Sequence, residues 1–507
     1  GMAALASPKA DTDALANVAV WNPLPWQRKC VCEVDLLFRS DYPAKALRSG
    51  HTGPVVNQFE LRDANDRAMP FQVLRVEQKR KVKGVGARGR RQSLGKEVDV
   101  YRVAVPLDLP AAGHTGLTVR PLEGVGAVRR QLGSLRRGPL EAENEHLAVK
   151  VTDDGTVELT GKADGRVYRD LFRYQDSGDA GDGWNFVPPI ANPTVVSPGR
   201  TAQVCVEQDG PLQVTFRIDR VLRVPAGLDP VQRERRCDEQ VDVRIVDRLT
   251  LRAGDGVLEV RTEVSNTARD HRLQVLFASG IAGESYWADQ PFAWVQRPVA
   301  TASGSAHYKE PDPVERPHHS VFAIADGDRG GLAVLCPEGL HEHCVYDDDA
   351  RTLGLTLFRS VGATPQTDGE PGPQVLGDLS FRYGLHPFGG ALPRAALLRR
   401  VAEMQAGVAT HLSAAAPGAR SFLQVTGSDD VLATALKPAA DGRSVVLRLW
   451  NPSDEDAEVR VQTANRQAAA SLCDLKEDDL QALSPSSEGV RVAVAARSLA
   501  CVRLVAE

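Results

Sequence analysis

A short stretch rich in aspartate and glycine, residues 176–184, carries the side chains best suited to hold a ligand. Its glycines let the backbone turn tightly and approach a bound molecule. Asp176, Asp179 and Asp182 offer carboxylate oxygens that can accept hydrogen bonds from a ligand, and Trp184 can stack on the apolar face of a ring while its indole N–H donates. The same residues also fit a structural loop, with the aspartates as turn formers and Trp184 in the core.

A second group of reactive residue types, Cys336, His341, His343 and Cys344, contains only legitimate zinc ligands. Their spacing matches none of the common zinc motifs, and the two histidines share a side only if both lie on one strand. We interpret them as ordinary strand residues. The sequence therefore predicts no metal site in this chain.

The elements that position these residues show the period-two alternation of half-buried strands. Residues 258–264, for example, place Leu258, Val260 and Val264 on one face and charged residues on the other, and turn signals such as 153–155, 253–256 and 441–442 separate such runs. The pattern predicts an all-β fold of tandem β-sandwiches with a large central supersandwich, a smaller C-terminal β-sandwich and few helices.

Composition shifts and loop-like segments predict the domain order. We expect a tail at 1–17, an N-terminal β-sandwich at 18–135, a central β-supersandwich at 136–391 and a C-terminal β-sandwich at 408–507. The one clear helical pattern, at 392–405, predicts a connecting helix within 392–407.

Composition and charge narrow the classes of partner. Hydrophobic residues make up 42% and charged residues 25% of the 507 residues, and the formal net charge is -5. These values predict a globular chain with no nucleic-acid partner. No stretch approaches the roughly 20 apolar residues that a membrane span needs, so we expect no membrane partner. The start of the chain shows no secretion signal and the eight cysteines are scattered, which favours a cytoplasmic protein with reduced thiols.

Six segments follow one another in an order that points to a family. The first contains Asn22-Pro23-Leu24, and the most specific, 176–189, reads DSGDAGDGWNFVPP. The others lie at 264–298, 330–362, 381–387 and 433–452. Together they resemble the C-terminal region of glycoside hydrolase family 38 α-mannosidases, whose matching stretch reads DSGDAGDxYxxxPP, and the resemblance covers residues 18–507.

The resemblance implies that catalysis and scaffold belong to different domains. Family members are retaining glycosidases that hold zinc in an N-terminal catalytic domain through "HxDxGW" and "HHD" motifs. Here Gly183-Trp184 has no histidine upstream in register, and His318-His319 is followed by Ser320. We therefore expect the catalytic domain and its zinc to be missing from this chain, with no catalytic residue and no cofactor in it. Retaining hydrolysis needs two carboxyl groups about 5 Å apart, so the chain alone is predicted to be inactive.

The resemblance also implies roles for single positions. The family tyrosine at position 184 reaches the active site and touches the sugar, and Trp184 stands there in this chain. It implies Trp184, Asp182, Asp179 and Asp176 as substrate-binding residues. It further implies that the tail at 1–17 is the remnant of a preceding helical bundle, and that the central supersandwich is galactose-mutarotase-like.

Three functions remain open at this point. The chain supplies scaffold and sugar contacts to an α-mannosidase whose catalytic domain acts in cis or in trans, or it is a carbohydrate-binding or regulatory protein derived from such an enzyme. The third is an independent enzyme resembling sugar mutarotases, which needs a histidine and a carboxylate placed together in the groove of the sandwich. For the first two we expect an α-mannoside or related carbohydrate as ligand, and self-association into a homo-oligomer is a further expectation.

Overall fold

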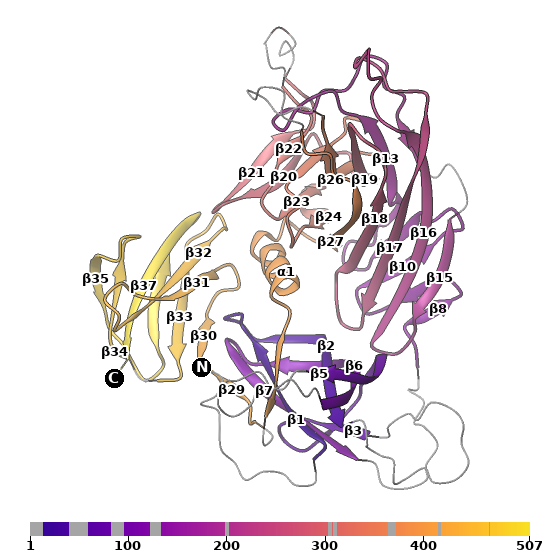
Figure 1. The fold of residues 1–507 in the computed structure, drawn as a ribbon. Helices are drawn as coiled ribbons and strands as arrows, with labels where there is room; N and C mark the ends of the chain where they lie inside the picture. The colour runs from indigo at the N-terminus through magenta and orange to yellow at the C-terminus, as the bar shows by residue number, and fades with distance from the viewer. Residues whose placement is uncertain are drawn as a thin grey trace, which may run out of the picture. The chain divides into compact units, whose positions relative to one another are not determined.

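The alternation of the sequence forms β-strands that assemble into seven sheets in the described part of the chain. The computed structural model describes residues 14–39, 59–82, 96–121, 133–197, 202–302, 307, 312–362, 372–413, 417–465 and 467–506. Among these residues α1 (Arg394–Ala406) is the only α-helix, and a short 3-10 helix, η3 (Gly327–Arg329), lies between two strands. The all-β prediction is therefore confirmed (Figure 1).

The chain divides into two compact units. Residues 1–134, 210–213 and 406–507 form one, called here the terminal unit, and residues 135–209 and 214–405 form the other, called the central unit. The terminal unit thus contains both ends of the chain. Most of the tail predicted at 1–17 lies outside the described residues, and β1 (Ala16–Asn22) begins at its end.

An N-terminal sandwich of two sheets makes up the first part of the terminal unit. Cys32, Val34 and Leu36 are buried, which is the inward face that their alternation predicts. They share one hydrophobic core with residues of the opposite sheet, such as Leu117. One sheet has the order β28 (Ala409–Ser413), β1, β7 (Gly113–Pro121), β3 (Phe59–Arg62) and β4 (Ala68–Met69), with β29 (Arg420–Ser421) also on β7, and the other has the order β2 (Arg28–Arg39), β6 (Lys96–Leu109) and β5 (Gln72–Val82).

Two strands from the predicted C-terminal sandwich belong to this N-terminal sheet. β28 pairs antiparallel with β1, and β29 pairs with β7. The physical reason is that an uncovered edge strand carries unpaired backbone groups, which β28 satisfies along β1. A glycine admits the close approach beside β7, because a Cβ on Gly116 would meet the Pro417 carbonyl oxygen at 2.1 Å. The separate C-terminal sandwich therefore begins at β30 (Leu423–Thr426), later than the predicted residue 408.

The C-terminal sandwich also consists of two sheets around one core. Val490, Val492 and Val494 are buried at the spacing that the sequence predicts, and they pack with Leu447 and Leu449 of the facing sheet. The smaller sheet has the order β30, β33 (Ala457–Thr463) and β36 (Val490–Val494), and the larger has the order β31 (Leu432–Pro438), β32 (Val445–Asn451), β37 (Ser498–Ala506), β34 (Gln467–Cys473) and β35 (Asp479–Leu483).

The central unit contains the large supersandwich, with three sheets around one continuous core. The nine-stranded sheet has the order β15 (Gln203–Gln208), β16 (Gln213–Pro225), β17 (Gln240–Arg252), β18 (Leu258–Asn266), β27 (Gly377–Phe388), β24 (Gly331–Leu335), β23 (Val321–Ala325), β20 (Ser285–Gln290) and β21 (Ala293–Pro298). The six-stranded sheet has the order β14 (Val195–Val196), β13 (Arg173–Gly178), β19 (His271–Phe277), β26 (Leu353–Ser360), β25 (Glu342–Val345) and β22 (Arg316–Pro317). The five-stranded sheet has the order β12 (Val167–Leu171), β11 (Val157–Gly161), β10 (Leu147–Val151), β9 (Glu141–Glu143) and β8 (Arg136–Gly138).

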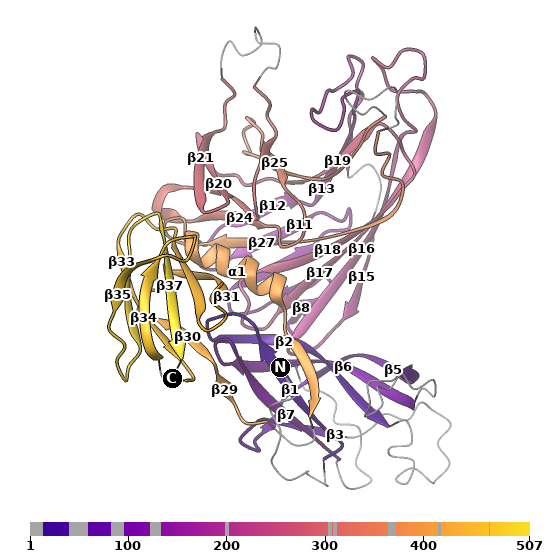
Figure 2. The same ribbon diagram turned by 60° about the vertical axis from the view of Figure 1, so that its left-hand side comes forward.

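The predicted helix packs on the nine-stranded sheet. Figure 2 shows α1 beside strands of this sheet such as β27. Leu397, Val401 and Met404 of α1 are buried and share a hydrophobic cluster with strand residues such as Ala323 and Leu335. Their spacing places all three on one side of the helix, as an amphipathic helix requires. Gly407 follows with φ 54°, a left-handed conformation that ends the helix and that glycine adopts freely.

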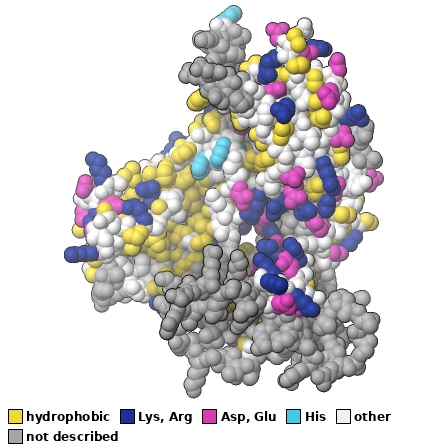
Figure 3. Space-filling view, in the orientation of Figure 1, with side chains coloured by type: hydrophobic (Ala, Val, Ile, Leu, Met, Phe, Trp, Pro, Cys, Tyr) yellow, Lys and Arg dark blue, Asp and Glu magenta, His cyan; other side chains and the backbone are white. Residues whose placement is uncertain are grey.

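The visible surface carries charges of both signs. Figure 3 shows lysine and arginine side chains mingled with aspartate and glutamate over the central unit. Many are paired across strands, such as Arg244 with Asp219 and Arg248 with Glu263. In the described ranges, no helix is long and apolar enough to span a membrane.

Candidate functional site

The aspartate-rich stretch begins inside a strand and leaves the six-stranded sheet as a loop. β13 ends at Gly178 and lies between β14 and β19. Asp176, within this strand, is fully buried. Its Oδ1 lies 2.5 Å from the Arg236 Nη2, and its Oδ2 lies 2.5 Å from Nδ1 of His271. Asp176 therefore anchors the strand that supports the loop.

Asp179 fixes the first turn of the loop. Its Oδ2 accepts a hydrogen bond from Arg359 Nε at 2.8 Å, and the Asp179 side chain is 0% exposed. Its Oδ1 accepts from the backbone N–H groups of Gly181 at 3.0 Å and Val187 at 3.3 Å. A single carboxylate thus ties together both sides of the turn, and its charge is balanced by Arg359.

Asp182 forms the tip of the loop. Its Oδ1 accepts hydrogen bonds from the backbone N–H groups of Asn185 at 3.0 Å and Trp184 at 2.8 Å. These two bonds hold the pKa of the Asp182 carboxyl below its usual range, so the group stays ionised. Arg359 reaches the same turn, because its Nη2 donates to the backbone oxygens of Asp182 and Asn185. The Asp182 Oδ2 accepts no hydrogen bond from the described residues.

Trp184 projects from this fixed tip. Its side chain is 79% exposed, so the alternative in which Trp184 packs in the core is wrong. Phe186 takes the inward place instead, with its ring 3.5 Å from the guanidinium carbon of Arg272. Gly181 is required beside them, because a Cβ there would meet the backbone oxygen of Asn185 at 2.0 Å. The loop is therefore held by a set of hydrogen bonds and presents a tryptophan to solvent.

Other apolar side chains are exposed on this loop and on the segment that a bridge joins to it. Ile190 is 86% exposed and Val187 is 46% exposed on the same loop. Val231 is 88% exposed on residues 226–238, which are joined to the loop by a bridge between Ala191 and Arg235. Exposed apolar side chains are common at sites of contact with another molecule.

The structure separates the four predicted substrate-binding residues into two kinds. Asp176 and Asp179 have no exposed surface, and their carboxylates pair with arginine or histidine side chains. Asp182 and Trp184 lie at the tip. We therefore keep the proposal of sugar contact for Asp182 and Trp184 only, and assign the other two aspartates to holding the loop.

The residues that hold the loop were only partly visible in the sequence. Arg359 lies in one of the segments that resemble the family, but no spacing rule joins it to Asp179, 180 positions away. His271 lies in another of these segments, 264–298, and Arg236 gave no signal of its own. The one available indication was the excess of acids in 176–182, because buried acids need cationic partners somewhere in the fold.

The cysteine and histidine group considered for zinc is divided by the strands. His343 and Cys344 are neighbours on β25 and so point to opposite faces. The Nδ1 of His343 lies 3.2 Å from the Nδ1 of His318, and burial lowers the pKa of His318 to about 3. Burial raises the pKa of the Cys344 thiol to about 12. Across the ranges given above, no three His, Cys, Asp or Glu side chains could hold a metal ion together, so the described residues do not fit a zinc ion.

Comparison with known families defines the class. Residues 142–366 match the family described as "Glycosyl hydrolases family 38 C-terminal domain", and residues 430–497 match the "Glycosyl hydrolases family 38 C-terminal beta sandwich domain". These two segments are therefore C-terminal domains of glycosyl hydrolase family 38. The first match includes the Trp184 loop and the arginine and histidine side chains that hold it.

Individual relatives agree with this class. Over 342 residues the chain is 28% identical to a protein of Halalkalibacterium halodurans described as "Putative mannosylglycerate hydrolase", a match that covers 64% of this chain and 37% of that protein. The fold is similar to the crystal structure of an alpha-mannosidase from Enterococcus faecalis, with a TM-score of 0.80 at 18% identity over 98% of this chain and 57% of the other. A second structure from Enterococcus faecalis, of a protein in glycosyl hydrolase family 38, gives a TM-score of 0.79 at 18% identity, with 98% and 60% covered.

The extent of these matches matters for function. The chain spans little more than a third of its curated relative and less than two thirds of either solved structure. The likeness to the solved structures shows the fold. The activity of a whole mannosidase is therefore a proposal for this chain.

Proposed function

We propose that this chain serves an α-mannosidase-type retaining glycoside hydrolase by giving scaffold and sugar contacts to a catalytic domain that lies outside these 507 residues. The single observation that carries the proposal is the hydrogen-bonded loop that presents Trp184 at 79% exposure. An exposed aromatic ring on a fixed backbone is well suited to stacking on a sugar, because little conformational entropy is lost on binding.

The ligand of this loop is an α-mannoside or a related carbohydrate. Support comes from the family matches and from the mannosylglycerate hydrolase name of the curated relative. Trp184 would lie against the apolar face of the sugar, and the open Oδ2 of Asp182 would accept from a hydroxyl. The carboxylate pair that breaks the glycosidic bond would come from the catalytic domain, in cis or in trans.

The exposed apolar side chains on this loop and on the segment joined to it support a protein partner as well. Ile190 and Val231 lie outside any core, with 86% and 88% exposure. In the proposed enzyme the catalytic domain covers this surface and places the sugar beside Trp184. The second candidate, a carbohydrate-binding or regulatory protein, uses the same loop without a catalytic partner.

Two assays test the proposal. The purified chain with added zinc is mixed with p-nitrophenyl α-mannoside, and we expect no turnover above buffer. The same chain is titrated with methyl α-mannoside, first alone and then in a mixture with the N-terminal part of the Halalkalibacterium halodurans relative. Turnover of p-nitrophenyl α-mannoside by the mixture, reduced at least tenfold when the chain carries W184A, supports the enzyme-part function.

The outcomes separate the alternatives. Sugar binding by the chain that depends on Trp184, without turnover in any mixture, favours the binding-protein function. Zinc-dependent turnover by the chain alone contradicts the proposal and points to an independent active site in the β domains.

A further inference from the structure

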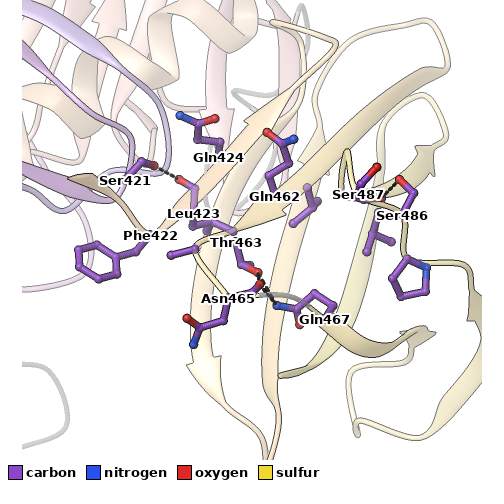
Figure 4. Close-up of a pocket in the computed structure, with 15 residues that line it drawn as sticks. Ser421, Phe422, Leu423, Gln424, Gln462, Thr463, Asn465, Gln467, Ser486 and Ser487 are labelled. Carbon is purple, nitrogen blue, oxygen red and sulfur yellow. Dashed lines mark hydrogen bonds between the residues drawn. The ribbon is translucent and has the colours of Figure 1, made fainter. Parts of the chain in front are cut away.

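A pocket on the C-terminal sandwich has a different chemistry from the Trp184 loop. It has a volume of about 760 Å³ and is formed by β30, β33, the start of β36 and the turn before it (Figure 4). This volume lies within the roughly 300–1,000 Å³ of small-molecule sites. The pocket belongs to the terminal unit, whereas the loop belongs to the central unit.

The lining of this pocket is polar but uncharged. None of the 15 residues that line it is charged, although 25% of the whole chain is charged. Among the described residues, no cation lines the pocket for a phosphate or sulfate, and no carboxylate lines it for a metal ion or an amine. Its polar side chains are amides and hydroxyls, namely Ser421, Gln424, Gln462, Thr463, Asn465, Gln467, Ser486 and Ser487.

Two of the amides form a pair with unused hydrogen-bonding capacity. Gln424 of β30 stands directly opposite Gln462 of β33 in the antiparallel register. Their side chains extend to the same side of the sheet (Figure 4). Neither side-chain amide hydrogen-bonds another described residue, so both offer a free carbonyl oxygen and a free NH2 group.

Space is kept open beside this pair by a glycine. Gly489 has φ 106°, and a Cβ there would meet the Val461 carbonyl oxygen at 2.4 Å and the Gln462 Cγ at 2.7 Å. A side chain is therefore excluded at this position. The turn is closed by Ser486, whose Oγ donates to the Gly489 carbonyl oxygen at 2.8 Å.

A third amide presents an unsatisfied acceptor. The Gln467 Nε2 donates to Thr463 Oγ1 and to the Asn465 backbone oxygen, but its Oε1 is buried without a hydrogen-bond partner. An unsatisfied buried acceptor costs about 1–3 kcal/mol. Because Gln467 bonds Thr463, which points to the opposite face from its neighbour Gln462, this amide belongs to the packing of the sandwich and not to the pair.

We propose that this pocket binds a short neutral glycan, with Gln424 and Gln462 as its recognition residues. An amide accepts through its carbonyl oxygen and donates through its nitrogen, so one side chain can engage two neighbouring hydroxyls of a sugar ring. Phe422 borders the pocket, but its ring packs against Trp21 and His114, so sugar stacking contributes little. We therefore expect weak binding, with a Kd on the order of millimolar. This site goes beyond the proposed function, because it does not use the Trp184 loop.

The test uses the purified full chain and ligand-observed NMR saturation transfer. The probes are α-mannobiose, maltose and cellobiose, with mannose 6-phosphate as a charged comparison. We expect at least one neutral disaccharide to bind, and the charged sugar to bind no better than it. The double variant Q424A/Q462A is expected to weaken binding at least tenfold. The matched control is Q481A, since Gln481 is an exposed glutamine on β35 outside the pocket.

A second variant blocks the pocket without removing either glutamine, so it tests binding independently of any effect of Q424A/Q462A on folding. Ser487 is exposed on the turn, so S487W is expected to fold, to keep its melting temperature and to block the pocket. The proposal is overturned if none of the neutral disaccharides binds. It is also overturned if binding survives both Q424A/Q462A and S487W, and loss of that binding in W184A would then place the sugar on the loop instead.

Discussion

Three aspartates of one short motif have three different roles, although the sequence presents them as equals. Asp176 is buried in a strand against Arg236 and His271, and Asp179 is buried against Arg359. Asp182 closes an exposed turn through backbone N–H groups. The chemistry of a carboxylate is thus decided by burial and partner, and only the third remains open to a ligand.

Substitution of Trp184 should separate function from stability. The side chain is 79% exposed, so W184A is expected to change the free energy of unfolding by no more than about 0.5 kcal/mol. F186A is the matched comparison, because Phe186 lies over Arg272, and it should destabilise the loop. Denaturant unfolding and α-mannoside titration of both variants check this. A large loss of stability in W184A would contradict the exposed position.

Removal of Arg359 should loosen the loop. The R359A variant leaves the buried Asp179 carboxylate without its cation, which is expected to cost about 3–5 kcal/mol. Limited proteolysis should then cut within residues 179–190 faster than in the wild type. R497A is the control, because Arg497 and Asp454 form an exposed pair that contributes about 0–1 kcal/mol. Equal protease resistance of R359A and wild type would show that the ion pair does not hold the loop.

At the scale of elements, a buried polar network joins the two large sheets of the central unit. Asp247 of β17 accepts hydrogen bonds from the Tyr174 hydroxyl of β13 at 2.6 Å and from Arg220 Nη1 of β16 at 2.6 Å. Thr262 of β18 adds a third bond at 2.6 Å and links to the Tyr383 hydroxyl at 2.9 Å. Burial raises the pKa of Tyr174, so its hydroxyl keeps the proton that it donates.

This network predicts a graded loss of stability. In D247A the buried Arg220 guanidinium loses its counter-ion, at an expected cost of about 3–5 kcal/mol. In Y383F an uncharged hydroxyl at the end of the network is lost, with its hydrogen bonds to Thr262 and Tyr174, at about 1 kcal/mol for each bond. Urea unfolding of the two variants measures the difference. Similar losses in both would mean that the charge of Asp247 is not needed in the core.

Two histidines on neighbouring elements should make stability depend on pH. Burial lowers the pKa of His318 to about 3 and that of His343 well below its ordinary value. In the unfolded chain both histidines have an ordinary pKa near 6.5, so they bind protons at a higher pH than they do in the folded protein. The contribution of His318 is therefore complete above pH 6.5 and is lost as pH falls toward 3, by about 1.4 kcal/mol per pH unit, and the contribution of His343 is lost in the same direction.

The variant H318L isolates this effect. We expect the slope of unfolding free energy against pH between 6.5 and 5 to fall by about 1.4 kcal/mol per unit. H411A is the control, because His411 of β28 is exposed. An unchanged slope in H318L would show that His318 is not held neutral in the folded protein.

At the scale of the whole molecule, the two ends of the chain share one unit. β28 and β29 complete the sheet that β1 and β7 begin, hundreds of residues earlier. A chain ending at residue 407 would lose both strands and expose the edge of β1, and we expect it to aggregate. A chain ending at residue 426 keeps them and should remain more soluble. Size-exclusion chromatography of the two truncations measures this, and equal behaviour would contradict a structural role for β28 and β29.

The sequence by itself determined the local features of this protein. Alternation placed strand faces correctly, as at Val34, Val260 and Val492, and an amphipathic run located the helix within two residues of its observed start. These features depend on neighbours along the chain, so periodicity and turn chemistry are sufficient to predict them. Motif order also predicted the family of the matched segments.

Only the tertiary structure decided which polar side chains bind other residues of the protein and which are open to a ligand. Asp179 meets Arg359 across 180 positions, Gln424 meets Gln462 across a sheet, and β28 returns to β1. Trp184 and Phe186 are both aromatic and close in sequence, yet one faces solvent and the other lies on Arg272. Such pairings depend on how distant strands align, and the desolvation of a charge or amide is set by that alignment and not by its neighbours in the chain.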